Sequence, residues 1–264
     1  MAVDRAVERR LSPSVSLTGR FSIGNDLLFD RMVLTLAGGQ WTCLLGESGV
    51  GKSTVLRLLA GLPTGGIFSG EISSADALPV QSRLAYMAQS DLLAPWLSVR
   101  QNLLLGHQLR GESVAAGRID GLLDQVGLAA HAHKRPAELS GGMRQRAALA
   151  RTLMQDCEFV LLDEPFSALD ARTRAEMQEL SFELLAGRTV LLVTHDPAEA
   201  ARLGHQILLM TRAGLKDVGA PAAPPVRAVD DMDMLRHQAG LLTLLRNGHR
   251  SEDDLSIPAA GGAA

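Results

Sequence analysis

The most chemically specific stretch of the sequence is a glycine-rich run that ends in lysine, serine and threonine. Its residues are Gly46, Glu47, Ser48, Gly49, Val50, Gly51, Lys52, Ser53 and Thr54. An apolar run precedes it and a segment with helical spacing follows, which is the context of a phosphate-binding loop. Glycines let successive N–H groups point into one concavity, and the helix N-terminus adds partial positive charge. Lys52 is therefore expected to reach the β- and γ-phosphates of a nucleotide, and Ser53 to hold Mg²⁺. The alternative is a glycine-rich turn without chemistry.

Two further polar groups directly follow apolar runs of β character: the pair Asp163 and Glu164, and the segment that contains His195. The three apolar runs cover residues 42–45, 159–162 and 189–193. Each is apolar along its length, as expected for a strand that is buried on both faces. Helical segments separate them, which favours parallel pairing. Because ligands bind outside the carboxyl ends of such strands, we expect the Lys52 loop, the acidic pair and His195 to meet at one edge of a sheet.

Asp163 and Glu164 are expected to have different roles. Asp163 is expected to bind Mg²⁺, mostly through water, and Glu164 to orient and polarise the water that attacks the γ-phosphate. The alternative is an acidic turn encouraged by Pro165. The nearby phosphate loop favours the catalytic interpretation.

Ser140, Gly141 and Gly142 open a predicted helix. Ser140 is a good N-cap, so plain capping is one explanation. Two glycines at that position cost up to roughly 1 kcal/mol each relative to alanine, however. This cost indicates that something approaches the backbone closely, and an anion at the exposed helix N-terminus would explain it.

The segment 139–146 resembles the signature motif of ABC-type ATPases. Other elements of that family follow in the same order. They are the phosphate loop (resembling Walker A), Gln89 (the Q-loop glutamine), residues 159–164 (Walker B with its catalytic glutamate), residues 167–170 (the D-loop) and His195 (the switch histidine). The resemblance covers roughly residues 15–215. It implies an α/β fold: a P-loop NTPase core with a mostly parallel sheet, an N-terminal antiparallel β subdomain and a helical insert.

The resemblance also implies how the site works. In this family two ATP-binding domains dock head to tail, and each nucleotide lies between Walker A of one and the signature motif of the other. Ser140 and Gly142, with Gly141 between them, would then touch the γ-phosphate across the interface. Gln89 would bind Mg²⁺ and couple the site to a transmembrane partner. Asp170 would link the two sites, and His195 would contact the γ-phosphate.

Family members usually stack an aromatic ring from the N-terminal hairpin on adenine. Phe21 is the candidate here, with Phe29 behind it. The hairpin is a residue or two longer than usual, and a core position for Phe21 is the alternative.

The segment 91–99 resembles the one after the Q-loop in importers for nitrate, sulfonates, taurine and pyrimidine precursors of thiamine. Residues 165–171 and the short C-terminal helix also resemble that group. In importers this surface receives the coupling helix of the permease. Trp96 could be an exposed anchor there or could pack inside the helical insert, and the sequence favours neither.

The chain is expected to divide into three parts. Residues 1–14 form a flexible leader, and residues 15–219 form the ATPase domain with its helical insert at about 91–150. Residues 220–264 comprise a linker, an amphipathic helix over 232–246 and a mobile tail. Periodicity also predicts a helix over 197–203 and a strand over 206–210.

Composition narrows the possible classes of protein. With 264 residues, 46% of them apolar and 21% charged, the chain can bury a sizeable core. Its net charge of −3 gives no reason to expect nucleic acid as a partner. Cys43 and Cys157 lie in or beside apolar runs, as small buried residues in a reducing compartment do. Residues 1–13 lack the apolar region of a signal peptide, and no stretch has the length of a membrane span.

Together with the motifs, the resemblance implies an ATP-hydrolysing subunit of a bacterial-type ABC importer, which binds ATP and Mg²⁺. It is expected to form a homodimer and to associate peripherally with a separate permease on the cytoplasmic face of the inner membrane. A solute-binding protein would be an indirect partner. The alternatives are a soluble ABC ATPase unconnected with transport, an ATP-sensing regulatory module and, more remotely, a monomeric P-loop kinase.

Overall fold

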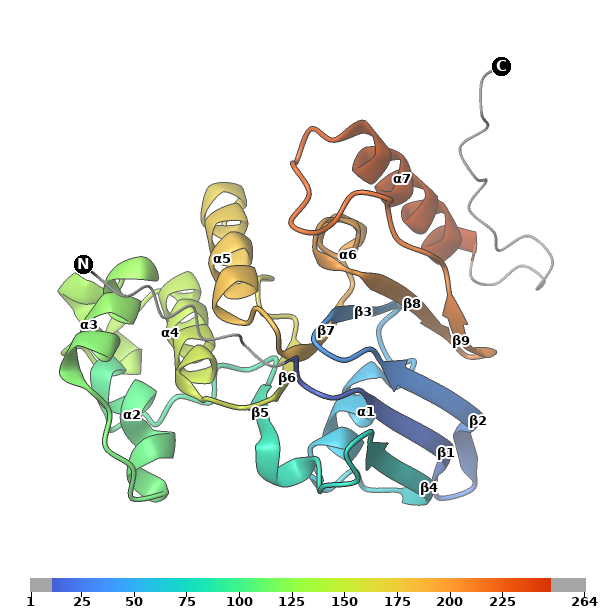
Figure 1. Ribbon diagram of the computed structural model, residues 1–264, viewed down its shortest axis with the longest axis horizontal. Helices are drawn as coiled ribbons and strands as arrows, with labels where there is room; N and C mark the ends of the chain where they lie inside the picture. The colour runs from blue at the N-terminus through green and yellow to red at the C-terminus, as the bar shows by residue number, and fades with distance from the viewer. Residues whose placement is uncertain (1–10, 248–264) are drawn as a thin grey trace, which may run out of the picture.

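The three apolar runs form adjacent strands at the centre of a six-stranded sheet in the computed structural model, which describes residues 11–247 (Figure 1). They are β6 (Phe159–Asp163), β7 (Thr189–Thr194) and β3 (Trp41–Gly46), and every residue in them is buried. The strand order is β5-β6-β7-β3-β8-β9, with β5 at Leu84–Met87, β8 at Gln206–Thr211 and β9 at Gly214–Asp217. All neighbours pair in parallel except β8 and β9. The expected mostly parallel sheet is confirmed.

Side chains alternate between two hydrophobic cores, one on each face of this sheet. In β3, Cys43 and Leu45 belong to one core and Leu44 to the other. The same alternation holds in β7, where Leu192 and Leu191 face opposite ways. A strand has a side-chain period of two, so a strand between two cores must be apolar at every position.

A second sheet and one helix cover one face. The sheet is antiparallel with the order β2-β1-β4, from Val15–Ile23 (β1), Asp26–Leu36 (β2) and Ile67–Ser74 (β4). Helix α1 (Lys52–Leu59) contributes Val55, Leu56 and Leu59 to the same core. This is the expected N-terminal antiparallel subdomain.

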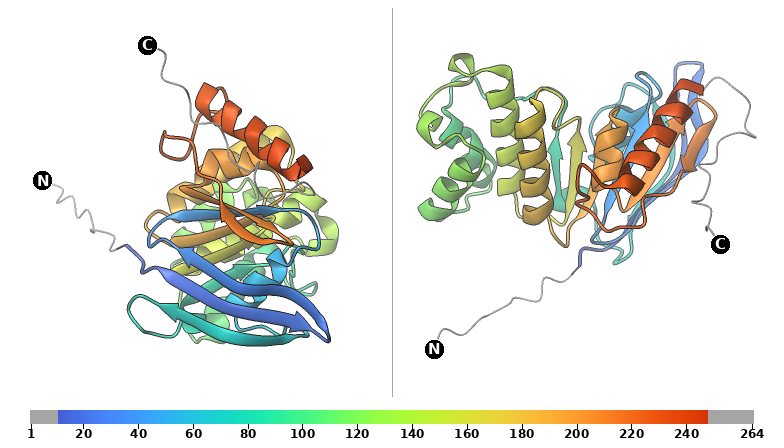
Figure 2. Two further views of the ribbon diagram at one scale, coloured as in Figure 1. Left: turned by 90° about the vertical axis from the view of Figure 1, so that its right-hand side faces the viewer. Right: turned by 90° about the horizontal axis from the view of Figure 1, so that it is seen from above.

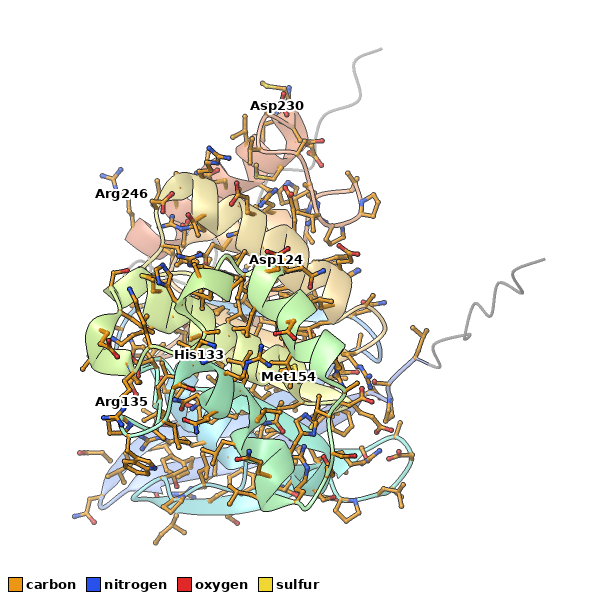
Figure 3. All side chains as sticks on the ribbon, turned by 90° about the vertical axis from the view of Figure 1, so that its left-hand side faces the viewer. Asp124, His133, Arg135, Met154, Asp230 and Arg246 are labelled. Carbon is orange, nitrogen blue, oxygen red and sulfur yellow. The ribbon has the colours of Figure 1, made fainter. Side chains whose placement is uncertain are left out.

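Helices cover the other face: α4 (Gly141–Met154), α5 (Ala171–Leu184), α6 (Pro197–Leu203) and α7 (Met232–Asn247). Helices α2 (Val99–Leu109) and α3 (Ala116–Gln125) pack beyond α4, at the end of the molecule farthest from the antiparallel sheet (Figures 1 and 2). Figure 3 looks onto that end, where Asp124, His133 and Arg135 are exposed. These helices lie within the segment expected to form the helical insert.

The termini of the described chain differ in part from expectation. Ser12, within the expected flexible leader, is buried, and its N–H donates to the Gly187 carbonyl at 2.9 Å. Residues 1–10 and the expected mobile tail lie outside the described residues. The linker has no regular structure at 220–225, and the predicted C-terminal helix is present as α7.

Two buried arginines attach the C-terminal segment to the core. The Arg227 guanidinium donates to the carbonyls of Ala201, Gly204, Pro221 and Ala223 at 2.7–2.9 Å. Arg202, in α6, donates to the Arg227 carbonyl at 3.1 Å. Helix α7 is therefore held on α6, which follows His195 directly. Within residues 11–247, no helix is both long enough and apolar enough to cross a bilayer.

Candidate functional site

The phosphate loop connects β3 to α1 through backbone conformations that favour glycine. Gly49 and Gly51 have φ values of 83° and 107°, which residues with a side chain rarely adopt. A Cβ on Gly46 would lie 2.4 Å from the Met210 carbonyl oxygen. Helix α1 begins at Lys52 with no side-chain cap and no acidic residue in its first turn. Its first N–H groups therefore remain available to an anion.

Lys52 points back into its own loop. Its Nζ donates to the carbonyls of Gly46 and Glu47, both at 2.7 Å. Burial lowers the pKa of the Lys52 ammonium, and the charges of Glu164, Asp163 and Glu47 oppose that change. A phosphate oxygen that enters the loop can replace the two carbonyls as the acceptor of these hydrogen bonds.

Asp163 ends β6 next to the first turn of α1. Burial raises the pKa of its carboxyl group, a hydrogen bond with the Ser53 hydroxyl lowers it, and the Glu164 charge raises it further. A carboxylate beside a hydroxyl provides two hard oxygen ligands, which is what Mg²⁺ uses alongside water and substrate phosphates. The residues present thus fit Mg²⁺. Among residues 11–247, no group of three or more His, Cys, Asp or Glu side chains is arranged so that it could hold a metal ion, so phosphates and water would have to complete the coordination shell.

Glu164 lies between the two other polar residues that follow strands of the sheet. Its Oε1 is 3.0 Å from Nδ1 of His195, which follows β7. Its Oε2 accepts a hydrogen bond from Nε2 of Gln89, which follows β5, at 3.2 Å. The Glu164 side chain is 16% exposed and that of His195 is 59% exposed. The structure therefore brings Gln89, Glu164 and His195 together at the edge where the Lys52 loop also lies.

The backbone of Glu164 is unusual. Its φ of 50° places a residue with a long side chain in the left-handed region. Its N–H donates to the Val193 carbonyl at 2.9 Å, which helps to hold that conformation. Non-glycine residues in this region persist only where the surrounding structure fixes them, and such positions cluster at functional sites.

The Ser140 helix end does not belong to the group formed by Gln89, Glu164, His195 and the Lys52 loop. Ser140 caps α4 by accepting from the Met143 N–H at 3.3 Å, and Ser140 and Gly141 are exposed. Helix α4 packs in the core on the opposite face of the sheet from α1 (Figures 1 and 2). Asp170 caps α5 by accepting from the Thr173 N–H at 3.1 Å, which holds the pKa of its carboxyl below the ordinary value. One copy of the chain does not bring these residues to its own phosphate loop.

The structure corrects the expectation for Phe21. Its ring is fully buried in the core and stacks on Phe29 with 5.7 Å between the ring centroids. Adenine cannot stack on a ring that has no exposed face, so the assignment of Phe21 to the nucleotide is wrong and the core alternative holds. An apolar group that does lie beside the phosphate loop is Leu28, because a Cβ on Gly51 would meet its Cδ2 at 2.9 Å.

Sequence reasoning missed two side chains near Glu164. Gln145, in α4, is buried against the loop that follows Glu164. Arg174, in α5, lines a cavity of about 280 Å³ together with Glu164, His195 and Glu199. Gln145 lies on the same helical face as the buried Ala148 and Thr152, so a polar side chain within a buried stripe was the signal that could have identified it.

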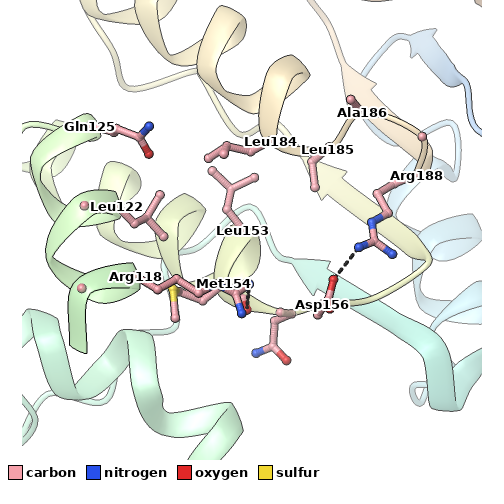
Figure 4. A pocket seen from close by; sticks show the side chains of 14 residues that line it. Arg118, Leu122, Gln125, Leu153, Met154, Asp156, Leu184, Leu185, Ala186 and Arg188 are labelled. Atoms are coloured by element: carbon pink, nitrogen blue, oxygen red, sulfur yellow. Dashed lines mark hydrogen bonds and ion pairs between the residues drawn. The ribbon is translucent and has the colours of Figure 1, made fainter. Parts of the chain in front are cut away.

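A larger cavity, of about 760 Å³, lies away from this edge (Figure 4). Leu122 of α3, Leu153 at the end of α4 and Leu184 at the end of α5 line it, and the ion pair of Asp156 and Arg188 closes one side. Asp156 and Arg188 precede β6 and β7, so the cavity lies toward the amino ends of the strands, opposite the Lys52 loop.

Comparisons with known proteins identify the family. The family model for ABC transporters matches residues 29–167. An uncharacterised ABC transporter ATP-binding protein of Haemophilus influenzae is 46% identical over 227 residues, which is 84% of this chain and 91% of the relative. The aliphatic sulfonates import ATP-binding protein SsuB 1 of Rhodococcus jostii is 47% identical over 224 residues, covering 81% and 88% of the two chains.

Solved structures share the fold. A chain of a metal-chelate type ABC transporter in an inward-facing conformation superposes with a TM-score of 0.64 at 26% identity, covering 78% of this chain and 83% of that one. A bacterial Atm1-family ABC exporter with ATP bound gives a TM-score of 0.68 at 23% identity, over 82% of this chain and 39% of that one. The chain belongs to the ABC transporter family, as one of the ATP-binding members that hydrolyse ATP to power transport.

Proposed function

We propose that this chain powers an importer for a small organic anion of the aliphatic sulfonate type. It acts as a homodimer bound to a separate permease on the cytoplasmic face of the inner membrane, with ATP and Mg²⁺. The observation that carries the ATPase mechanism is the position of Glu164 between Gln89 and His195, beside the Lys52 loop. The solute class and the direction of transport are supported by relatives whose names specify aliphatic sulfonate import.

Hydrolysis begins with the triphosphate in the Lys52 loop. The Glu164 carboxylate takes a proton from water as the water oxygen attacks the γ-phosphorus. The bond from the γ-phosphorus to the oxygen bridging it to the β-phosphate breaks, so that ADP and inorganic phosphate form. Gln89 and His195 hold the two carboxylate oxygens. His195 is also proposed to contact the γ-phosphate. When bound by Ser53, Gln89 and Asp163, Mg²⁺ would neutralise charge on the phosphates.

The second copy completes each site. Ser140 and Gly141 are exposed at the start of α4, which packs in the core on the opposite face of the sheet from α1. A head-to-tail partner brings this end to the γ-phosphate, where the helix N-terminus stabilises negative charge. Asp170, exposed at the start of α5, links the two sites.

The permease is proposed to dock on the segment that follows Gln89. Trp96 is 71% exposed and Leu92 is 63% exposed, which favours the anchor interpretation of Trp96 over a packed one. Arg151, in α4, fixes the segment by donating to the carbonyls of Asp91 and Leu92 at 2.8 and 2.6 Å. A rigid surface with exposed apolar side chains suits a protein partner.

The test of the mechanism is Glu164→Gln. We expect the variant to bind ATP but to lose roughly 10²-fold or more in turnover, because the amide cannot accept the proton. ATP should also shift the variant to a dimer in gel filtration. Glu183→Gln, an exposed glutamate in α5, is the matched control and should keep normal activity. Near-normal ATPase activity of Glu164→Gln would show that the assignment of the base is wrong.

Co-purification with a multi-span permease, and uptake of a labelled alkanesulfonate by the complex, test the transport role.

A further inference from the structure

Gln145 is a buried glutamine, with 7% of its surface exposed, in the second turn of α4. Its hydrogen bonds connect to the loop between β6 and α5. Its Nε2 donates to the Glu164 carbonyl at 3.0 Å and to the Ser167 hydroxyl at 3.2 Å. Its Oε1 accepts from the Ala168 N–H at 2.7 Å. One amide side chain thus holds the loop at three points.

These bonds fix the backbone on which the Glu164 carboxylate depends. The Glu164 N–H is held by the Val193 carbonyl, and its own carbonyl is held by Gln145. Between these two contacts the residue has a φ of 50°, which is unfavourable for a residue with a long side chain such as glutamate. A strained backbone relaxes when a restraint is removed, and the direction of the side chain changes with it.

The N-terminal end of α4 contacts the same loop directly. A Cβ on Gly142 would lie 3.3 Å from the Ala168 carbonyl oxygen and 3.6 Å from Cδ2 of Leu169. Little free space therefore separates this end of the helix from the loop, and Gln145 bonds the same loop, so we expect a displacement of the Ser140 helix end to move the loop that carries Glu164.

Helix α4 also holds the other loop that contacts the carboxylate. Arg144 pairs with Asp91, with 3.0 Å between Nε and Oδ2, and Arg151 donates to the Asp91 carbonyl. Asp91 is two residues beyond Gln89, which donates to Glu164. The one helix that Ser140 caps is thus bonded to both sides of the Gln89–Glu164 contact.

We propose that Gln145 is a positioning residue that ties the Glu164 carboxylate to the Ser140 helix end of the same chain. The proposal rests on the proposed function, in which Ser140 contacts the nucleotide bound by the partner copy. The nucleotide of one site then sets the direction of the catalytic carboxylate of the other site, through α4 and Gln145. If ATP at one site turns the carboxylate of the other into its productive direction, ATP hydrolysis is positively cooperative.

The test compares Gln145→Met, which keeps the length of the side chain without its hydrogen bonds, with Gln145→Glu, which keeps only the acceptor for Ala168. We expect kcat to fall roughly tenfold or more in both, because small misplacements at a reacting centre are costly. The KM for ATP should stay within roughly twofold, since the Lys52 loop is untouched, and the Hill coefficient should fall toward 1. Gln178→Met is the matched control: Gln178 is equally buried, at 4% exposed, but its amide oxygen accepts from Arg202 instead.

Two results overturn the proposal. One is a kcat and Hill coefficient of both Gln145 variants within about twofold of the wild type, which would show that the bonds do not position Glu164. The other is an equal loss of kcat in Gln178→Met, which would show a general effect of losing a buried amide. Failure of the proposed function is recognised separately, because Glu164→Gln would then not dimerise with ATP. If the Met variant does not fold, the Glu variant decides the outcome.

Discussion

Glu199, in α6, is a buried carboxyl group whose ionisation should cost stability. Its side chain is 5% exposed, and Oε2 accepts a hydrogen bond from the Thr194 hydroxyl at 2.7 Å. Burial raises the pKa of this carboxyl from 4.5 to about 7; the Asp196 charge acts in the same direction, and Thr194, Arg174 and His195 oppose it. The perturbation is Glu199→Gln, because an amide is isosteric, can accept from Thr194 and never ionises.

The sign of the effect follows from proton linkage. The folded protein binds a proton at Glu199 that the unfolded chain has already released between pH 4.5 and about 7, so stability falls as pH rises through that window. One pKa unit corresponds to about 1.4 kcal/mol, so the cost of ionisation is about 1.4 kcal/mol near pH 5.5 and about 3 kcal/mol near pH 8. Glu199→Gln removes this cost. The gain in stability should therefore be about 2 kcal/mol larger at the higher pH.

Urea unfolding of both proteins at the two pH values, followed by circular dichroism, measures this difference. Other titrating groups affect wild type and variant alike, so they cancel in the comparison. Glu183→Gln, at an exposed position, serves as the control and should change stability by the same small amount at both pH values. If Glu199→Gln changes stability equally at both pH values, the reasoning is refuted. That result would mean that ionisation of Glu199 does not destabilise the folded protein.

Two further predictions concern the phosphate loop and the docking surface. Gly46→Ala should lower the free energy of unfolding by about 1–3 kcal/mol and weaken ATP binding, because the new Cβ meets the Met210 carbonyl oxygen at 2.4 Å. Gly117→Ala, where a Cβ meets nothing within 4 Å, is the control in thermal denaturation and should not destabilise the protein. Trp96→Ala should leave stability within about 0.5 kcal/mol and ATPase activity unchanged, yet reduce recovery of the permease in pull-downs. Leu109→Ala, at a similarly exposed position on α2, is the control and should leave stability, ATPase activity and permease recovery unchanged. If Trp96→Ala recovers as much permease as the wild type does, Trp96 is not the anchor.

The central elements were predictable from the sequence because their signals are local. A strand between two cores needs an apolar side chain at every position, so residues 42–45, 159–162 and 189–193 were identifiable, and their parallel pairing is confirmed. Capping is equally local: Ser140 accepts from the third residue after it and starts α4 as predicted. The loop 46–54 lies between a strand and a helix, as its glycines and flanking segments indicated.

Only the tertiary structure determined which of these side chains are buried and which are exposed to solvent. Phe21 lies in a strand whose two neighbours come from different parts of the sequence, β2 and the more distant β4, and their packing buries the ring. Trp96 is exposed and Gln145 is buried for the same kind of reason, since each depends on segments far away in the chain. The left-handed backbone of Glu164 likewise depends on contacts with Val193 and Gln145. Periodicity and capping depend on residues within one or two turns, whereas burial depends on long-range packing that no local pattern encodes.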